Sequence, residues 1–398
     1  MDTKPSNDLR RLGAILALGM VAGFGARYVM SRTAARQPAQ PVDVNRRLVN
    51  WDQARSIALR VSQWEQAPVH DRVARRAQYA RMVEQSVPMI AQYMGVDLPQ
   101  PVSRLYVADR RDWLLANFES FEQLFAPVEE LYAKVAAQRG GVNATIGGIN
   151  GRVLGAQMGV LIGFLSKRVL GQYDLSLLSP DTETQGALYF VEPNIAKVQN
   201  QLGLNDEDFR LWIALHETTH VFQFEAFPWV RPYFNELLRQ FLDQLSDQMA
   251  SLGIGVGKLA ARLLSGRGSG KHWIEQMLTP EQQRVFDRMQ ALMSIVEGYS
   301  THVMNTIGEQ MLPSFQQIEQ RMEQRKGNRP LLEELFNRIT GMDLKLSQYQ
   351  QGEQFIDAVV AARGLAFANR VWDKADNIPT MTEIRNPHTW IARIERGA

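Results

Sequence analysis

The sequence predicts a mainly α-helical protein with a few short β-strands (α+β), and three observations carry that prediction. Apolar residues recur at three- and four-residue steps through most of the chain after Trp51, which is the period of an amphipathic helix. Two runs, 103–110 (SRLYVADR) and 186–193 (GALYFVEP), are typical of β-strands. Hydrophobic residues make up 45% of the 398 residues and charged residues 22%, which is ordinary for a folded globular chain.

Charge and cysteine content narrow the classes of function. Lysine and arginine together number 44, and aspartate and glutamate 42, so the net charge is only +2. That balance gives no reason to expect a nucleic-acid partner, which would favour a basic surface. The chain has no cysteine, which excludes disulfides, thiolate catalysis and cysteine-ligated zinc. Any metal ion must therefore be held by histidine, aspartate or glutamate, and the chain has only six histidines.

An apolar segment near the N-terminus favours membrane attachment. Two arginines precede fifteen uncharged residues, 12–26, and the apolar character continues to residue 30 if one arginine snorkels. A spanning helix needs roughly 20 apolar residues, so we expect a single membrane anchor over residues 12–30. Two alternatives stay open: a twin-arginine signal peptide, although no convincing cleavage site follows, and a glycine-rich apolar helix packed on the body of the protein, which would then be cytoplasmic. Basic residues on both sides leave the orientation open.

The division of the chain follows from a linker and one further apolar run. Residues 31–42 (SRTAARQPAQPV) are small, polar and proline-containing, which is typical of a linker. We therefore predict an N-terminal segment and linker, 1–42, and a single folded domain, 43–398. The second apolar run, 153–171, carries glycines at i, i+4 and i+8, which lie on one helix face. We interpret it as a buried, closely packed helix rather than a membrane span.

The most informative functional pattern is HETTH at residues 216–220, an HExxH motif. It lies in a predicted helix that starts after Asn205, a residue type that caps helices, and ends before Pro228. Two histidines four residues apart share one helix face, so both imidazoles can bind one zinc ion. Glu217 between them would take a proton from the water that the metal activates. The alternative is a histidine pair on a partly buried helix, hydrogen-bonded to its neighbours.

A catalytic zinc site needs a third protein ligand, and the stretch 294–305 (SIVEGYSTHVMN) supplies two candidates. Glu297 follows an apolar run, where a carboxylate is costly to bury unless a cation pairs with it. The rival is His302, which lies about 140° away around a helix, so we do not expect both to be ligands. His302 or Tyr299 would then stabilise a developing oxyanion or support a ligand from behind. Without a metal, Glu297 would be a salt-bridged carboxylate and His302 an ordinary half-buried histidine.

The sequence resembles a bacterial protein family over residues 48–396. The similarity is carried by separate blocks in order, among them NWDQA, RRDWLLANFESF, FRLWIALHETTHVFQFEAFPWVRPY, IVEGYSTHVMN and PTMTEIRNPHTWIARI. The family is zincin-like, and its members are named zinc-dependent metalloproteases or hydrolases from their motif. One branch is named for an association with biosynthesis of the deazaflavin coenzyme. Residues 1–42 fall outside the shared region, so the resemblance says nothing of membrane attachment.

The resemblance implies a mainly helical, zincin-like metallohydrolase fold with a zinc site. Carried over residue by residue, it makes His216 and His220 metal ligands, Glu217 the general base and Glu297 the third ligand. Many zincins with a glutamate ligand place an aspartate four residues later, where it supports a histidine ligand. This sequence has Thr301 at that position, so the resemblance does not identify the residue that supports the histidines.

These observations predict a zinc-dependent hydrolase, in the first place a metallopeptidase that acts on a peptide or protein substrate. The fourth metal position would then be left to water. The alternative hypothesis is a non-catalytic zincin-fold binding or scaffold protein at a membrane, with structural zinc or none. A fourth protein ligand such as His302 would favour the alternative, and a cleft that reaches the metal would favour the enzyme.

Overall fold

The computed structural model describes residues 49–66, 68–138, 142–174, 186–252, 279–327 and 342–397. The predicted membrane anchor at 12–30 and the predicted boundary between residues 42 and 43 lie outside these ranges. The described residues fall into two compact units. Of the described residues, the smaller unit takes 49–62, 125–138 and 142–165, and the larger unit takes the rest.

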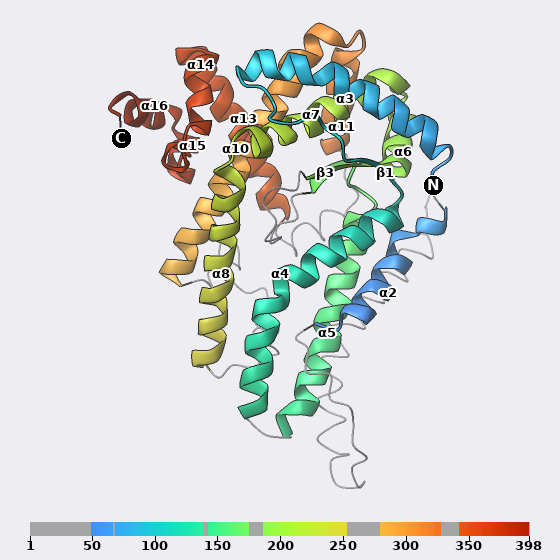
Figure 1. Ribbon diagram of the computed structural model, residues 1–398, viewed down its shortest axis with the longest axis vertical. Coiled ribbons are helices and arrows are strands. Elements are labelled where there is room, and N and C mark those ends of the chain that lie inside the picture. Colours follow the sequence, from blue (N-terminus) through green and yellow to red (C-terminus); the bar gives the residue numbers. More distant parts are fainter. Residues whose placement is uncertain are drawn as a thin grey trace, which may run out of the picture. The chain divides into compact units, whose positions relative to one another are not determined.

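The smaller unit is built from α2 (Trp51–Ser62), the second part of α4 (Arg110–Gln138) and α5 (Val142–Leu165). Helices α2 and α5 lie side by side (Figure 1). Glycines on one face of α5 permit this approach, because a Cβ atom on any of them would lie 2.5–2.8 Å from a backbone carbonyl oxygen of the facing segment. These glycines are Gly155, Gly159 and Gly163.

The apolar run at 153–171 is therefore a packed helix, as the sequence predicts. Its helical part ends at Leu165, and the residues that follow turn into a strand. Within the described ranges, no helix is both long and apolar enough to cross a membrane.

The larger unit combines a small sheet with most of the helices. Its strands are β1 (Leu105–Ala108), β2 (Gly171–Asp174) and β3 (Ala187–Val191). Besides the first part of α4, its helices are η1 (Trp64–Gln66), α3 (Arg72–Met94), α6 (Glu192–Leu202), α7 (Asp206–Val221), η2 (Phe222–Ala226), α8 (Val230–Leu252), α10 (Pro280–Met311), α11 (Phe315–Gly327), α13 (Met342–Arg363), α14 (Leu365–Ala368), η4 (Asn369–Trp372), η5 (Ala375–Asn377), α15 (Met381–Arg385) and α16 (Pro387–Glu395). The prediction of a mainly helical fold with a few short strands is confirmed.

The sheet has the order β1-β3-β2, so β2 forms one edge. Strand β1 runs parallel to β3, and β2 runs antiparallel to it. The two runs that the sequence predicted as strands became β1 and β3. Strand β2 was missed, because Gly-Gln-Tyr-Asp has a low intrinsic preference for strands and forms one by pairing with β3.

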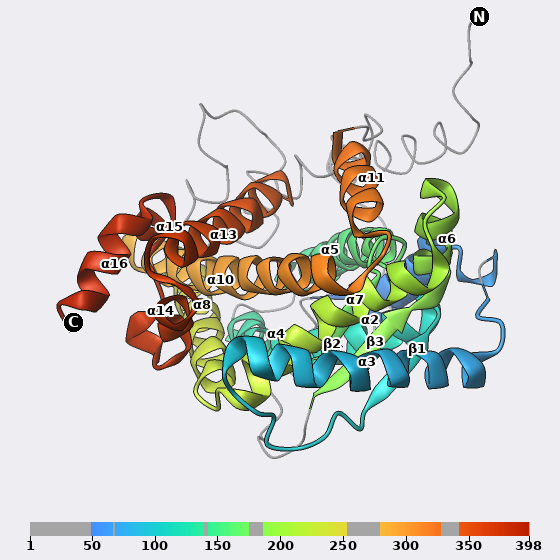
Figure 2. The same ribbon diagram turned by 90° about the horizontal axis from the view of Figure 1, so that it is seen from above.

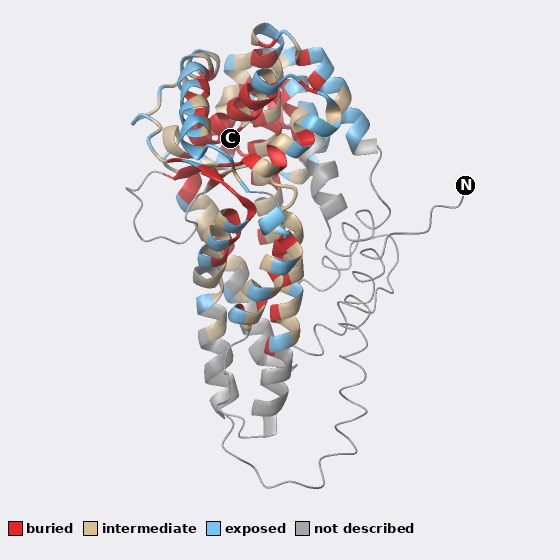
Figure 3. Cartoon of the chain, turned by 90° about the vertical axis from the view of Figure 1, so that its right-hand side faces the viewer, coloured by how far each residue is buried: buried red, intermediate tan, exposed pale blue. Residues whose placement is uncertain are grey.

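Helix α10 is central to the larger unit, where it packs against α7, α8 and α13. Figure 2 shows α13 on one side of α10 and α7 on the other. The buried residues of this unit gather around its sheet and these helices (Figure 3). Large fully buried side chains fill the core, among them Tyr79, Phe190, Phe209, Phe355, Trp372 and Trp390.

The ends of α7 and α10 are set by local sequence. The Asn205 side chain accepts hydrogen bonds from the backbone N–H groups of Glu207 and Asp208, which caps α7 as predicted. At α10, Thr279 and Gln282 form a reciprocal capping box. Because these two helices carry the HExxH motif and the stretch 294–305, their caps help to fix the elements that form the site.

Candidate metal centre

Helix α7 presents the two histidines of the motif from one face. The Nε2 atoms of His216 and His220 lie 3.2 Å apart, and both side chains are mostly buried. A tetrahedral zinc ion with Zn–N bonds of about 2.0–2.1 Å holds its ligand atoms about 3.3–3.4 Å apart. The separation of the two imidazole nitrogens therefore fits a shared zinc ion.

Helix α10 supplies a carboxylate to the same point. Glu297 Oε2 lies 3.7 Å from the Nε2 atom of His216, and Oε1 lies 4.0 Å from that of His220. The candidate ligand atoms of the three residues all lie within 4.8 Å of one another. This donor set of two imidazoles and one carboxylate, which the structure brings together as the sequence suggested, suits zinc.

The outer nitrogen of His220 is held by a hydrogen-bond network. Gln223 donates from its amide nitrogen to the backbone carbonyl oxygen of Val296 (2.8 Å), so its amide oxygen faces His220. The Nδ1 atom of His220 lies 2.8 Å from that oxygen and 3.1 Å from the Ser300 hydroxyl. The Nδ1 atom must then carry the ring proton and donate a hydrogen bond to Gln223. The lone pair of Nε2 is therefore free to bind a metal ion between His216, His220 and Glu297.

The two histidines have opposite pKa shifts. Burial lowers the pKa of His220 to about 4, so this ring stays neutral at physiological pH. Burial also opposes protonation of His216, but its interactions with Glu297 and Glu217 outweigh that effect and raise its pKa. The buried Nδ1 atom of His216 has no hydrogen-bond partner among the described residues. The carboxylates of Glu297 and Glu217 favour a positive charge between the ligand side chains, and a bound cation would supply that charge.

Glu217 lies beside the three ligands, with only 6% of its surface exposed. Burial raises its pKa to about 7, with a further contribution from Glu297 and an opposing one from His216. Gly171 of strand β2 lies directly against this carboxyl group: a Cβ atom at that position would be only 2.5 Å from Glu217 Oε1. Glycine is therefore required there if the carboxylate is to keep its position.

A cavity of about 230 Å³ contains these groups. Its polar part holds the histidines and the two glutamates, and strand β2 forms one wall. The other lining residues add an apolar wall, formed by Phe224, Met293 and Val296. The cavity thus places a buried carboxylate, a three-ligand cluster and an apolar surface within one small volume.

The structure places Tyr299 and His302 away from the lining of this cavity. The Tyr299 hydroxyl donates to Asn369 (2.6 Å), and His302 bonds to Tyr93 and Asp357. In this structure both side chains are thus hydrogen-bonded outside the cavity, and a role for either one at an oxyanion or behind a ligand stays a prediction. The 140° spacing explains this outcome, since Glu297 faces α7 and His302 faces α3 and α13.

Sequence reasoning missed the groups that support the site. Thr301, four residues after Glu297, donates its hydroxyl to the backbone carbonyl oxygen of Glu297 (3.0 Å). Ser300 and Gln223 instead hold His220. Gln223 lies three residues after His220, so its helical spacing could have revealed it. Gly171 could not have been found in this way, because only the tertiary fold brings β2 to the motif.

Comparison with known proteins agrees with this geometry. Residues 49–391 match the model of a family described as zincin-like metallopeptidases. The chain belongs to that family. A crystal structure of a candidate hydrolase with a novel fold, from Chloroflexus aurantiacus, is 54% identical in sequence. The match covers 87% of this chain and 99% of the other, with a TM-score of 0.66. None of the curated proteins matches the sequence.

Family membership and the similar hydrolase support a metal-dependent hydrolase in general. The zincin-like family implies a metal, usually zinc, and the His-His-Glu cluster provides residues that fit one. Within the described part of the chain, this cluster includes no fourth histidine or carboxylate ligand.

Proposed function

We propose that the protein is a zinc-dependent peptidase in which His216, His220 and Glu297 hold the metal and Glu217 is the general base. The observation that carries the proposal is the position of Glu217, whose buried carboxyl group lies in the same cavity as the three ligand side chains. A structural zinc site is closed by four protein ligands, whereas a catalytic one keeps a position for water and substrate. Three ligands beside a proton acceptor therefore favour catalysis.

In the proposed hydrolysis, the metal ion, Glu217 and the residues that hold His220 have different roles. When bound, zinc supplies a Lewis acid that polarises a carbonyl group and makes water more acidic. Glu217 takes a proton from the attacking water and delivers it to the leaving nitrogen. A carboxyl group with a pKa of about 7 suits both transfers, because neither protonation state is strongly favoured near neutral pH. Gln223 and Ser300 keep the His220 ring in one orientation throughout.

Strand β2 supports a peptide as the substrate. The backbone N–H of Val191 donates to the carbonyl of Leu170, so the alternating pattern of an antiparallel ladder directs the backbone groups of Gly171 and Tyr173 away from β3. An extended peptide could add to this edge as a further strand. Its carbonyl groups would then run past Glu217, with a side chain against the apolar wall of the cavity.

The test is a substitution that removes the base and keeps the shape. Glu217→Gln should bind zinc as the wild type does and lose hydrolysis of peptide substrates by about 100-fold or more. Glu84→Gln, which changes an exposed glutamate, is the matched control and should leave both properties unchanged. Zinc content and turnover of a quenched-fluorescent peptide library would be measured side by side. Full activity in Glu217→Gln would rule out the proposed mechanism.

Membrane attachment through residues 12–30 also stays a prediction. It fits an anchored peptidase and equally the scaffold hypothesis, so it does not separate the two. Fractionation of cells that express the full chain and a variant lacking residues 1–42 would test it: loss of the protein from the membrane fraction only after truncation would support the anchor.

A further inference from the structure

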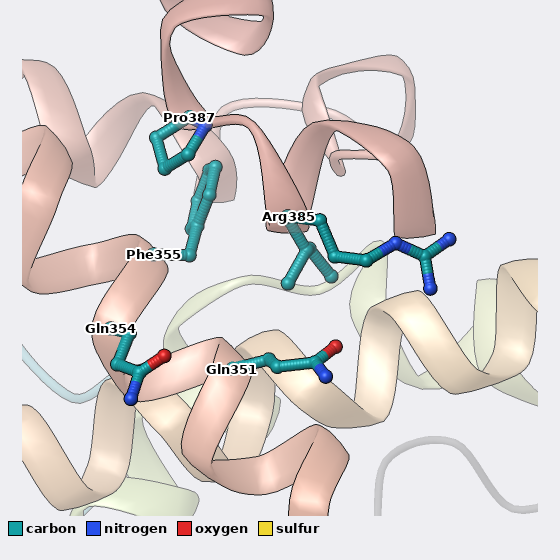
Figure 4. Close-up of a pocket in the computed structure, with 6 residues that line it drawn as sticks. Gln351, Gln354, Phe355, Arg385 and Pro387 are labelled. Carbon is teal, nitrogen blue, oxygen red and sulfur yellow. The ribbon is translucent and has the colours of Figure 1, made fainter.

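A second cavity of the larger unit has no role in the proposed hydrolysis. It lies between α13 and the segment that joins α15 to α16, and its volume is about 320 Å³ (Figure 4). That volume is within the range of small-ligand sites. Its lining combines polar and apolar side chains: Gln351, Gln354, Phe355, Ile384, Arg385 and Pro387.

A positively charged side chain, that of Arg385, lines this pocket. Arg385 is exposed and forms no ion pair within the described part of the chain. Pro387, the first residue of α16, lines the pocket, so the positive end of that helix dipole also lies there. A guanidinium group pairs best with a planar anion such as a carboxylate, through two parallel hydrogen bonds.

A buried acceptor adds a second requirement. The Oε1 atom of Gln351 is buried and has no hydrogen-bond partner among the described residues. Figure 4 shows this amide oxygen on the side of Arg385. A buried acceptor without a donor costs free energy, so a ligand with an N–H or O–H group would be favoured there. Phe355 and Ile384, both almost fully buried, provide the apolar floor.

We propose that this pocket binds an α-carboxylate that is flanked by an N–H group and an apolar side chain. The carboxylate would pair with Arg385, the N–H would donate to Gln351, and the side chain would lie on Phe355 and Ile384. Two sources share this chemistry: the C-terminal residue of a peptide and a free, N-acylated amino acid. The proposal does not depend on the metal centre, because none of its residues lines that cavity.

Fluorescence anisotropy with a labelled octapeptide that ends in leucine tests the proposal. The full chain would carry Glu217→Gln, so that cleavage does not remove the probe. We expect the free-acid peptide to bind at least tenfold more tightly than the same peptide with a C-terminal amide. Arg385→Gln should weaken binding of the free acid at least tenfold. Arg81→Gln, which changes another exposed arginine, is the matched control and should have no effect.

A second variant separates the acceptor from the charge. Gln351→Leu keeps the size of the side chain, removes the buried oxygen and should weaken binding about threefold to tenfold. Equal affinities of the acid and amide peptides, equal effects of Arg385→Gln and Arg81→Gln, or no binding up to about 1 mM would each overturn the proposal.

Competition by N-acetyl-leucine distinguishes the two sources. Displacement at an affinity similar to that of the peptide would identify free N-acyl amino acids as ligands. Displacement that requires at least tenfold more competitor would identify the peptide C-terminus, because contacts beyond the last residue then contribute. Both results support the α-carboxylate site, and both are independent of whether the metal centre hydrolyses anything.

Discussion

Two histidine clusters lie in the larger unit, and they use their ring nitrogens differently. In one cluster, both nitrogens of His302 have partners: Nδ1 lies 2.6 Å from Asp357 Oδ1, and Nε2 lies 2.7 Å from the Tyr93 hydroxyl. In the metal centre, His216 and His220 turn their Nε2 atoms toward each other at 3.2 Å. Only His220 has side-chain partners on its outer nitrogen, within the described residues.

The difference teaches how a structural histidine can be distinguished from a metal ligand. Both clusters combine histidine with a carboxylate, and α10 contributes to each through Glu297 or His302. The ring of His302 is satisfied by hydrogen bonds and would gain little from a cation. In the metal centre, nitrogen atoms and a carboxylate face one point, an arrangement that favours a bound cation. Hydrogen-bond use, rather than residue type, therefore separates the two.

The largest expected effect is loss of zinc from one cluster only. Glu297→Ala should reduce bound zinc from about one ion per chain to near zero at low free zinc, because two imidazoles alone bind it weakly. His302→Ala, on the same helix, should keep its zinc. Plasma mass spectrometry of the purified proteins measures both. Equal zinc loss in the two variants would show that the two clusters do not differ in metal binding. A wild-type protein that holds no zinc, even after zinc is supplied, would show that the three residues do not form a zinc site.

A smaller effect is expected from the support of His220. Gln223→Leu removes the acceptor that fixes the ring, and partners of this kind typically contribute 10- to 100-fold in metal affinity. Titration with a competing chelator would report the loss. Gln92→Leu, which changes an exposed glutamine on α3, is the control. Unchanged affinity in Gln223→Leu would mean that helix packing alone orients the imidazole.

The helix contact between the two clusters should affect stability. A Cβ atom on Gly298 would lie 2.2 Å from the carbonyl carbon of Gly352, so Gly298→Ala must push α10 away from α13. Overpacking of this kind typically costs about 1–3 kcal/mol in the free energy of unfolding. Because Gly298 adjoins Glu297, zinc affinity should fall as well. Denaturant unfolding with and without zinc would measure both, and an unchanged midpoint would show that the helices can separate freely.

The smallest effect is expected at the rim of the second cluster. Asp357→Asn removes the charge that faces His302, but the aspartate side chain is 56% exposed. Exposed pairs contribute about 0.2–1 kcal/mol, so we expect a loss of that order and no change in zinc content. Thermal unfolding and metal analysis of the same sample would report both. A large stability loss would show that the second cluster is more than a surface hydrogen-bond pair.

Features of the fold that depend on local sequence could be predicted. The Asn205 cap, the helix with the HExxH motif and strands β1 and β3 follow from capping, periodicity and β-propensity. The packed helix at 153–171 follows from the spacing of its glycines. Strand β2 could not be predicted, because its four residues become a strand only when β3 is beside them.

The same limit applies to the site. The motif and the apolar run before Glu297 indicated three ligands, which the structure brings together. The sequence placed His302 on another face of the helix than Glu297, but it could not identify the partners of Tyr299 and His302, because Asn369 and Asp357 come from distant segments. Nor could it show Gly171 against Glu217, since that contact joins a strand to a helix more than forty residues away.

One feature beside the metal centre bears on sequence alignment. Helix α7 ends at Val221, one residue after His220, and the chain continues as a π-helix over Phe222–Ala226. A π turn contains about one more residue than an α turn of the same height, and such turns are frequent at functional sites. Removing one residue from this segment would rotate the chain that follows it by about 100° relative to His216 and His220. Relatives in which this segment is a plain α-helix should therefore lack one residue here when the sequences are aligned. The distribution of that gap among the relatives would show in which branch of the family the π-helix arose.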